Sequence, residues 1–263
     1  MKIAIIGAGA SGMVAALNLA KNNLVYVFEK NSDVGKKLLL TGSGRCNLGN
    51  VDNSLSKYHS SNDELIKYII NYGNLNKVNE LFKEIGLVIK NKNGYLYPFS
   101  EKSSSVLSAL KNACLESGVN FRFCSTILNV EKINDKFIVN GEKFDKLIVA
   151  TGGCSYPKTG SVGIGYDIAK NFGHNITDLF PSLVPLYTKN SLEKEWKGIR
   201  CEAIVSLYEN DKFIKSEHGE LQLNSEGLSG ICIFNLSRNI KLGLNHNCKE
   251  EIRINFTPWT NDL

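Results

Sequence analysis

Residues 2–12 read KIAIIGAGASG, and residues 25–29 read VYVFE. The first stretch begins as a short apolar run of the kind that forms a β-strand and continues into the glycine pattern G-x-G-x-x-G. The second stretch predicts another strand that ends at Glu29. The separation in sequence between the glycine pattern and Glu29 is close to the roughly 20 residues found in dinucleotide-binding units. There Glu29 would accept hydrogen bonds from ribose hydroxyls, and its charge would repel a 2′-phosphate. This order of strand, turn, helix, strand and acid predicts a Rossmann-like α/β fold with a nucleotide site.

Each glycine of the pattern has a predicted role. Gly7 would permit the tight turn, Gly9 would let the backbone approach a pyrophosphate, and Gly12 would allow close packing of helix on strand. The helix that follows begins near Ala10 and Ser11. Its positive N-terminal end would therefore face the phosphates of the nucleotide.

The composition of the chain excludes several classes of protein. The 263 residues are 43% hydrophobic and 22% charged, which is ordinary for a soluble globular protein of one large or two modest domains. No apolar run approaches the roughly 20 residues that span a bilayer. The N-terminus leads directly into a strand and has no signal-peptide pattern. Seven scattered cysteines without a C-x-x-C favour a reducing compartment. We therefore expect a cytoplasmic protein without membrane association.

The net charge of +5 is thinly spread, and its main basic cluster is Lys30, Lys36, Lys37 and Arg45. Because this cluster accompanies a predicted phosphate site, it favours a small bound anion over nucleic acid. The expected partner is a small-molecule substrate, and the oligomeric state is left open.

Two further glycine-rich segments have the character of ligand-binding loops. Residues 35–47 read GKKLLLTGSGRCN, and small residues followed by Arg, Cys and Asn suit a loop whose backbone lies against a ligand. Residues 146–150 form an apolar run that predicts a buried parallel strand, and it ends in ATGG at 150–153. Ligands gather at the carboxyl ends of such strands, so this segment is interpreted as a second contact with the nucleotide rather than as an ordinary glycine turn.

The pattern along the chain predicts a division near Pro181–Pro185. Residues 1–180 would form the dinucleotide-binding domain, with a helical excursion at about 55–92 and a helix over 103–116. In that helix Val106, Leu107, Leu110 and Leu115 are expected to point inward. Residues 181–263 would form a β-rich domain, with predicted strands at 203–208, 221–223, 231–234 and 251–256.

Several motifs recur in this order in one family. They are Gly7–Gly12, Glu29, residues 35–47, Tyr97-Pro98 followed by Lys102, the ATGG segment, and Gly219-Glu220-Leu221 followed by Gly227-Leu228-Ser229-Gly230. On these motifs the chain resembles the NAD(P)/FAD-dependent oxidoreductase flavoproteins of the HI0933-like group, also labelled aminoacetone oxidase-like. The resemblance covers essentially the whole chain, and residues 35–47 are its most specific part.

The resemblance implies FAD, held by a nucleotide-binding domain into which a β-rich domain is inserted. Glu29 would hold the adenosine ribose, Ile127 would meet the adenine edge, and Lys37 with the 41–47 loop would run toward the flavin. The implied cofactor-binding residues are Gly7, Gly9, Ala10, Ser11, Gly12, Glu29, Lys30, Lys37, Thr41, Gly42, Gly44, Arg45, Cys46, Asn47, Ile127, Thr151, Gly152 and Gly153.

The chain also departs from the family pattern. Leu48-Gly49-Asn50 replaces an expected aromatic or Leu, Thr and Asn. Family members are longer and return from the inserted domain to complete the FAD site, whereas this sequence stops at Leu263. The expectation is therefore an N-terminal fragment or a truncated product.

The expected activity is that of an FAD-dependent oxidoreductase, which passes hydride between a small organic substrate or NAD(P)H and the flavin. The alternatives are an NAD-dependent dehydrogenase and a truncated, non-catalytic nucleotide-binding fragment. Lys37, Arg45 and Cys46 are the candidate catalytic residues, although Cys46 is better explained as a small residue packed beside the cofactor. The four histidines lack metal-ligand spacing, so no metal is expected.

Overall fold

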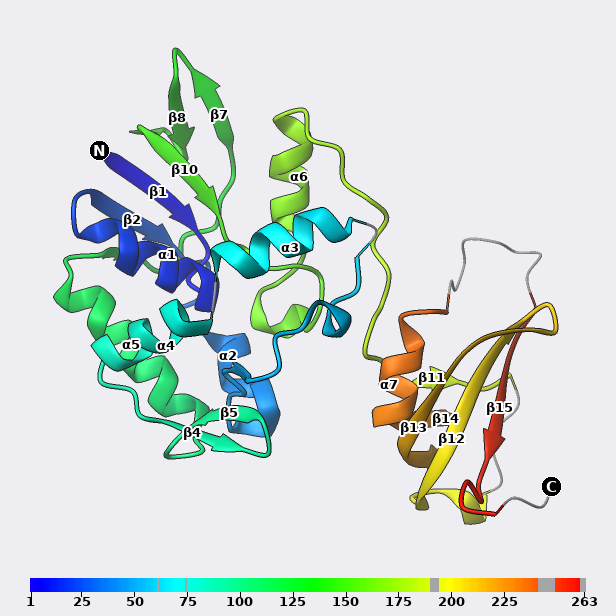
Figure 1. Cartoon of the computed structure of the whole chain (residues 1–263). Helices are drawn as coiled ribbons and strands as arrows, with labels where there is room; N and C mark the ends of the chain where they lie inside the picture. Colours follow the sequence, from blue (N-terminus) through cyan, green and yellow to red (C-terminus); the bar gives the residue numbers. More distant parts are fainter. Residues whose placement is uncertain (61, 74, 190–193, 241–248, 261–263) are drawn as a thin grey trace. The chain divides into compact units, whose positions relative to one another are not determined.

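The computed structural model describes residues 1–60, 62–73, 75–189, 194–240 and 249–260. The chain divides into two compact units, Met1–Ile176 and Thr177–Leu263 (Figure 1).

The first unit is built on a parallel sheet in the order β10-β1-β2-β6. Its strands are β1 (Lys2–Ile6), β2 (Leu24–Phe28), β6 (Asn120–Arg122) and β10 (Lys146–Val149). In the register, Ile5 lies opposite Val27 on one side and Ile148 on the other. The helix α1 (Ala10–Ala20) connects β1 to β2, and α5 (Ser103–Glu116) precedes β6. This arrangement confirms the predicted Rossmann-like α/β fold.

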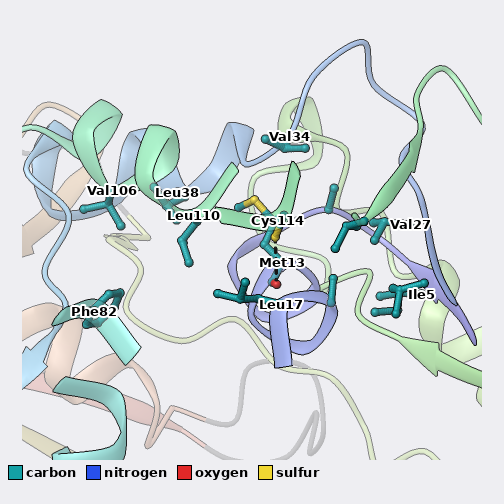
Figure 2. Packing of buried hydrophobic residues seen from close by; sticks show 14 of the residues in the cluster. Ile5, Met13, Leu17, Val27, Val34, Leu38, Phe82, Val106, Leu110 and Cys114 are labelled. Atoms are coloured by element: carbon teal, nitrogen blue, oxygen red, sulfur yellow. Dashed lines mark hydrogen bonds between the residues drawn. The ribbon is translucent and has the colours of Figure 1, made fainter. Parts of the chain in front are cut away.

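The main core of this unit lies where α1 packs on α5 and on the sheet (Figure 2). Met13 of α1 is fully buried, and its carbonyl oxygen accepts a hydrogen bond from the Cys114 thiol at 3.4 Å. Val106 and Leu110 point inward as predicted. The prediction for Leu115 is wrong, since it is 52% exposed. Cys114, one position earlier, lies on the helix face that carries Val106 and Leu110 and so takes the inward position.

The strand β10 is parallel to β1 as predicted, but the expectation that it is buried is wrong. It lies at the edge of this sheet in the described part of the chain, and Val149 is 41% exposed. A separate antiparallel sheet of β7 (Val130–Ile133), β8 (Lys136–Val139) and β9 (Glu142–Phe144) precedes it. Phe144 of this sheet is buried edge-to-face against Phe28, with ring centroids 5.7 Å apart.

The predicted helical excursion contains α3 (Asp63–Tyr72) and α4 (Leu75–Glu84), and α3 ends at Gly73. The antiparallel strands β3 (Gly49–Asn50), β4 (Ile89–Lys92) and β5 (Tyr95–Pro98) flank them in sequence. The remaining short elements are α2 (Lys36–Leu40), the 3₁₀ turns η1 (Thr41–Gly44), η2 (Leu55–Lys57) and η3 (Pro157–Thr159), and α6 (Ile164–Asn171). Residues 35–47, predicted as a loop, thus include a short helix.

The described part of the second unit is an antiparallel sheet in the order β11-β14-β13-β12-β15, on which the helix α7 packs. Its elements are β11 (Leu186–Tyr187), η4 (Lys194–Trp196), β12 (Arg200–Glu209), β13 (Lys212–Asn224), β14 (Gly227–Gly230), α7 (Ile231–Ser237) and β15 (Glu250–Asn255). The prediction of a strand at residues 231–234 is wrong, because these residues form the first part of the helix α7. Cys232, Ile233 and Leu236 have helical spacing and are buried against the sheet. A short apolar run cannot distinguish this helix from a strand.

None of the helices in the described residues combines the length and the apolar character needed to cross a bilayer.

Candidate nucleotide-binding site

A cavity of about 610 Å³ opens in the first unit, where β1, β2 and β10 end. Its volume lies within the range of roughly 300–1,000 Å³ that is typical of small-molecule and cofactor sites. Four stretches of the chain contribute most of its lining, namely residues 6–14, 28–48, 125–127 and 150–164. The cavity thus lies at the carboxyl ends of parallel strands, the position where ligands bind in this kind of sheet.

The three glycines of the first turn have different surroundings. A Cβ on Gly7, whose φ is +102°, would lie 2.5 Å from the carbonyl oxygen of Ala150. A Cβ on Gly12 would lie 1.9 Å from the carbonyl oxygen of Gly7. A Cβ on Gly9, by contrast, would meet no atom within 4 Å. Gly7 and Gly12 therefore serve close packing, while Gly9 leaves open space beside the cavity that it lines.

The N-terminal end of α1 lies open to this cavity. Gly9 caps the helix in an extended conformation, and among the described residues the cap has no side-chain hydrogen bond. Ala10 and Ser11 are exposed and line the cavity. The first N–H groups of a helix have no partner inside the helix, and they carry its positive partial charge. The geometry therefore provides hydrogen-bond donors for an anion.

Glu29 lies at the end of β2 and is only 8% exposed. Its Oε2 accepts a hydrogen bond from the backbone N–H of Ala8 at 3.0 Å. Its Oε1 accepts two from Asn31, from the backbone N–H at 2.8 Å and from Nδ2 at 2.6 Å. The carboxylate is therefore held in a defined position beside the glycine turn.

Three lysines line the cavity near this carboxylate. Lys36 Nζ donates to Asn31 Oδ1 at 2.8 Å, and Lys37 Nζ donates to Ser155 Oγ at 3.3 Å. In the described part of the chain, neither these two lysines nor Lys30 forms an ion pair. Glu29 is the one acidic residue among the residues that line the cavity. The lining therefore carries excess positive charge, which favours an anionic ligand.

The 41–47 loop contributes to the cavity only in part. Thr41, Cys46 and Asn47 line it, while Arg45 is exposed outside it. The Arg45 Nε donates to the carbonyl oxygen of Gly42 at 3.3 Å, and the guanidinium lies 5.5 Å from the ring centroid of Tyr97. Burial raises the pKa of the Cys46 thiol, and a hydrogen bond with Thr41 offsets only part of that rise. At neutral pH this thiol is protonated, which disfavours Cys46 as a catalytic thiolate.

The structure brings most of the predicted cofactor-binding residues together around this cavity. Those that line it are Gly7, Gly9, Ala10, Ser11, Glu29, Lys30, Lys37, Thr41, Cys46, Asn47, Ile127, Thr151 and Gly152. Gly12, Gly42, Gly44, Arg45 and Gly153 are not among the lining residues.

The sequence prediction missed one wall of the cavity. Thr159, Gly160, Ser161, Val162 and Ile164 line it, and Ile164 is the first residue of α6. The stretch TGSVGIG at 159–165 is rich in small residues immediately before a helix, and it is the signal that marks this wall. Asn31, Ser125 and Thr126 also line the cavity and were not predicted.

Comparison with known proteins gives a family match over most of the chain. The family described as HI0933-like protein Rossmann domain matches residues 1–242. This match confirms the resemblance drawn from the motifs.

Three curated relatives are similar along nearly all of this chain. A 3-dehydro-bile acid delta(4,6)-reductase of Clostridium scindens is 33% identical over 265 residues, covering 98% of this chain and 64% of the relative. A ribosomal RNA dihydrouridine synthase of Haemophilus influenzae is 32% identical over 270 residues, covering 94% and 66%. A protein of the same name from Escherichia coli is 29% identical over 265 residues, covering 97% and 63%. The chain thus spans 63–66% of the length of these relatives.

Proposed function

The chain belongs to the HI0933-like family, and on that premise we propose that its first unit binds FAD and serves a flavin-dependent oxidoreductase. The observation that carries the proposal is the open N-terminal end of α1 beside Gly9. A diphosphate there would receive hydrogen bonds from backbone N–H groups, in the space that a Cβ at position 9 would enter.

We propose the following contacts between the lining residues and the parts of FAD. Glu29 would accept a hydrogen bond from the adenosine ribose, and Ile127 would contact the adenine. Lys37 would offset negative charge on the diphosphate, since its Nζ reaches the segment after Thr151 and Gly152. Thr41, Cys46 and Asn47 would border the flavin side of the cavity.

A bound flavin would supply the redox chemistry by accepting or donating a hydride equivalent. The chain's own residues would bind and orient it. Lys37 is the candidate for balancing negative charge near the cofactor, because its side chain lines the cavity. Arg45 stays a weaker candidate, because the structure places it outside the lining. Cys46 would act as a protonated, small neighbour of the cofactor and not as a nucleophile.

The names of the curated relatives support a proposal for the class of substrate. One name describes reduction of a bile acid that carries ring double bonds and an oxo group, and the other describes formation of dihydrouridine, in which the uracil ring is saturated. Both reactions reduce a carbon–carbon double bond conjugated to a carbonyl group. We propose that this chain belongs to a protein acting on such a bond in a small organic molecule, with NAD(P)H as the electron donor.

The first test is a visible absorption spectrum of the purified chain after incubation with FAD and gel filtration. We expect flavin bands to travel with the protein. Reduction of those bands by NADH or NADPH, followed by reoxidation on adding an α,β-unsaturated ketone, would support the substrate class. A chain that retains no FAD, but whose melting temperature rises with NAD⁺, would contradict the flavin proposal in favour of a nicotinamide site.

A further inference from the structure

Asn31 connects four segments that surround one end of the cavity. Its Nδ2 donates to Glu29 Oε1 at 2.6 Å and lies 3.3 Å from the carbonyl oxygen of Thr159. Its Oδ1 accepts from Lys36 Nζ at 2.8 Å. Its carbonyl oxygen accepts from the backbone N–H of Cys124 at 3.0 Å. The side chain and the backbone of Asn31 thus connect the end of β2, the start of α2, the turn after β6 and the turn η3.

The hydrogen bonds of Glu29 leave little freedom in how it can receive a ligand. A carboxylate has about four lone-pair positions, two on each oxygen. Both positions on Oε1 are used by Asn31, and one position on Oε2 is used by Ala8. One acceptor position on Oε2 is therefore left. Without the Asn31 side chain the carboxylate would lose one of its three donors, the Nδ2 group, and would be freer to reorient toward solvent.

We propose that Asn31 is a positioning residue for the adenosine half of the dinucleotide. It fixes the Glu29 carboxylate so that its remaining acceptor position is available to a ribose hydroxyl, and it ties Thr159 to the same wall of the cavity. The inference rests on the proposed function, because it takes an adenosine-containing ligand as the occupant.

The chain offers a matched control for a merely structural effect. Asn129 Nδ2 donates to Glu131 Oε1 at 2.6 Å, which repeats the distance and the two-residue spacing of the Asn31–Glu29 bond. Asn129 and Glu131 are not among the residues that line the cavity, and both are exposed. The same substitution at Asn129 therefore tests what the loss of such a bond does elsewhere in the fold.

The experiment measures the affinity of the 263-residue chain for ADP and for FAD by titration calorimetry. The variants are Asn31→Asp, Asn31→Ala, Glu29→Ala, the double variant Asn31→Ala with Glu29→Ala, and Asn129→Asp. Asn31→Asp keeps the shape and the acceptor for Lys36 but replaces the donor to Glu29 by a carboxylate. Circular dichroism melting without ligand checks that each variant folds. If Asn31→Asp does not fold, Asn31→Ala, which adds no charge, takes its place.

We expect Asn31→Ala to weaken ADP and FAD binding by about tenfold or more, as for loss of a hydrogen bond to a charged group, and Asn31→Asp to weaken it at least as much. Asn129→Asp should stay within about twofold of the unsubstituted chain. In the Glu29→Ala background, Asn31→Ala should have almost no further effect, since it acts through Glu29 and adds no charge to the cavity.

Two results would overturn the inference while leaving the proposed function intact. One is unchanged ADP affinity in Asn31→Ala. The other is an effect of equal size with and without the Glu29 carboxylate. An unsubstituted chain that binds neither ADP nor FAD would overturn the proposed function and the inference together.

Discussion

The carbonyl oxygen of Gly7 and the Cα of Gly12 are so close that a Cβ on Gly12 would lie 1.9 Å from that oxygen. The first turn of α1 therefore packs directly on the strand-to-helix turn that precedes it. This contact holds the N-terminal end of α1 at the cavity, because it leaves no room for any side chain between turn and helix.

Gly12→Ala should prevent stable folding of the first unit. The added methyl group meets backbone and not a movable side chain, so α1 would have to shift away from the turn. We expect the free energy of unfolding to fall by about 3 kcal/mol or more. Chemical denaturation followed by circular dichroism measures this change. A variant with unchanged stability would contradict the packing at this position.

Gly9→Ala should leave folding intact and weaken nucleotide binding. Its Cβ meets no protein atom within 4 Å, and the φ of −75° suits alanine. The methyl group would instead occupy space beside the first N–H groups of α1. We expect an unchanged melting temperature without ligand and an affinity for ADP that is lower by about tenfold or more. Unchanged affinity would show that the diphosphate does not approach Gly9.

Lys37→Ala should weaken FAD binding and reduce its dependence on salt. The Lys37 ammonium lines the cavity without an ion-pair partner in the described residues, so its charge is available to a phosphate. We expect affinity to fall by about tenfold at low ionic strength and by less at high salt. The control is Lys143→Ala on β9, an exposed lysine outside the lining. Equal effects of both substitutions would mean that only net charge matters.

The cysteines should divide into two groups by their reaction with iodoacetamide at pH 7.5. Cys124 and Cys154 are exposed and should be labelled in the folded chain. Cys46, Cys114 and Cys232 are buried, and burial raises the pKa of each thiol. They should react only after unfolding, because the thiolate is the reacting form. Mass spectrometry of peptides after timed labelling measures this order. Labelling of Cys46 in the folded chain would contradict the expectation and make Cys46 a candidate reactive thiol again.

Cys114 should make the stability of the chain fall at alkaline pH. Burial raises the pKa of this thiol from its ordinary value of 9.0 to about 11 in the folded chain. Between these two values the unfolded chain loses the proton while the folded chain keeps it, so the free energy of unfolding decreases as the pH rises. Denaturation midpoints from pH 8.5 to 11 should fall less steeply for Cys114→Ala. Equal slopes would show that other groups cause the loss.

The parts of the fold that were predictable from the sequence depend on local chemistry. The turn and helix after β1 follow from three glycines and an apolar run, and α5 follows from its periodic apolar residues with the bounds predicted, Ser103–Glu116. Residues 231–234 were not predictable in this way. Their apolar pattern fits a strand as well as a helix, and only the packing of Cys232, Ile233 and Leu236 against the second sheet distinguishes the two.

The residues of the candidate site also differ in whether local sequence could predict them. The residues that follow β1, β2 and β10 could be predicted, because the topology of the fold brings these strand ends together. The contact between Asn31 and Thr159 could not, since the two residues are 128 positions apart in the chain. Arg45 was predicted from its motif, yet its contact with Tyr97 of β5 holds its guanidinium outside the cavity lining.

The distribution of the lining residues along the chain affects how cooperatively the first unit opens and unfolds when a ligand is bound. Its residues run from Ile6 to Ile164, and all of them belong to the unit Met1–Ile176. A ligand that touches several of these stretches acts as a reversible crosslink, because the stretches could separate only after releasing it. Amide hydrogens across that unit would then exchange with solvent more slowly once the ligand is bound.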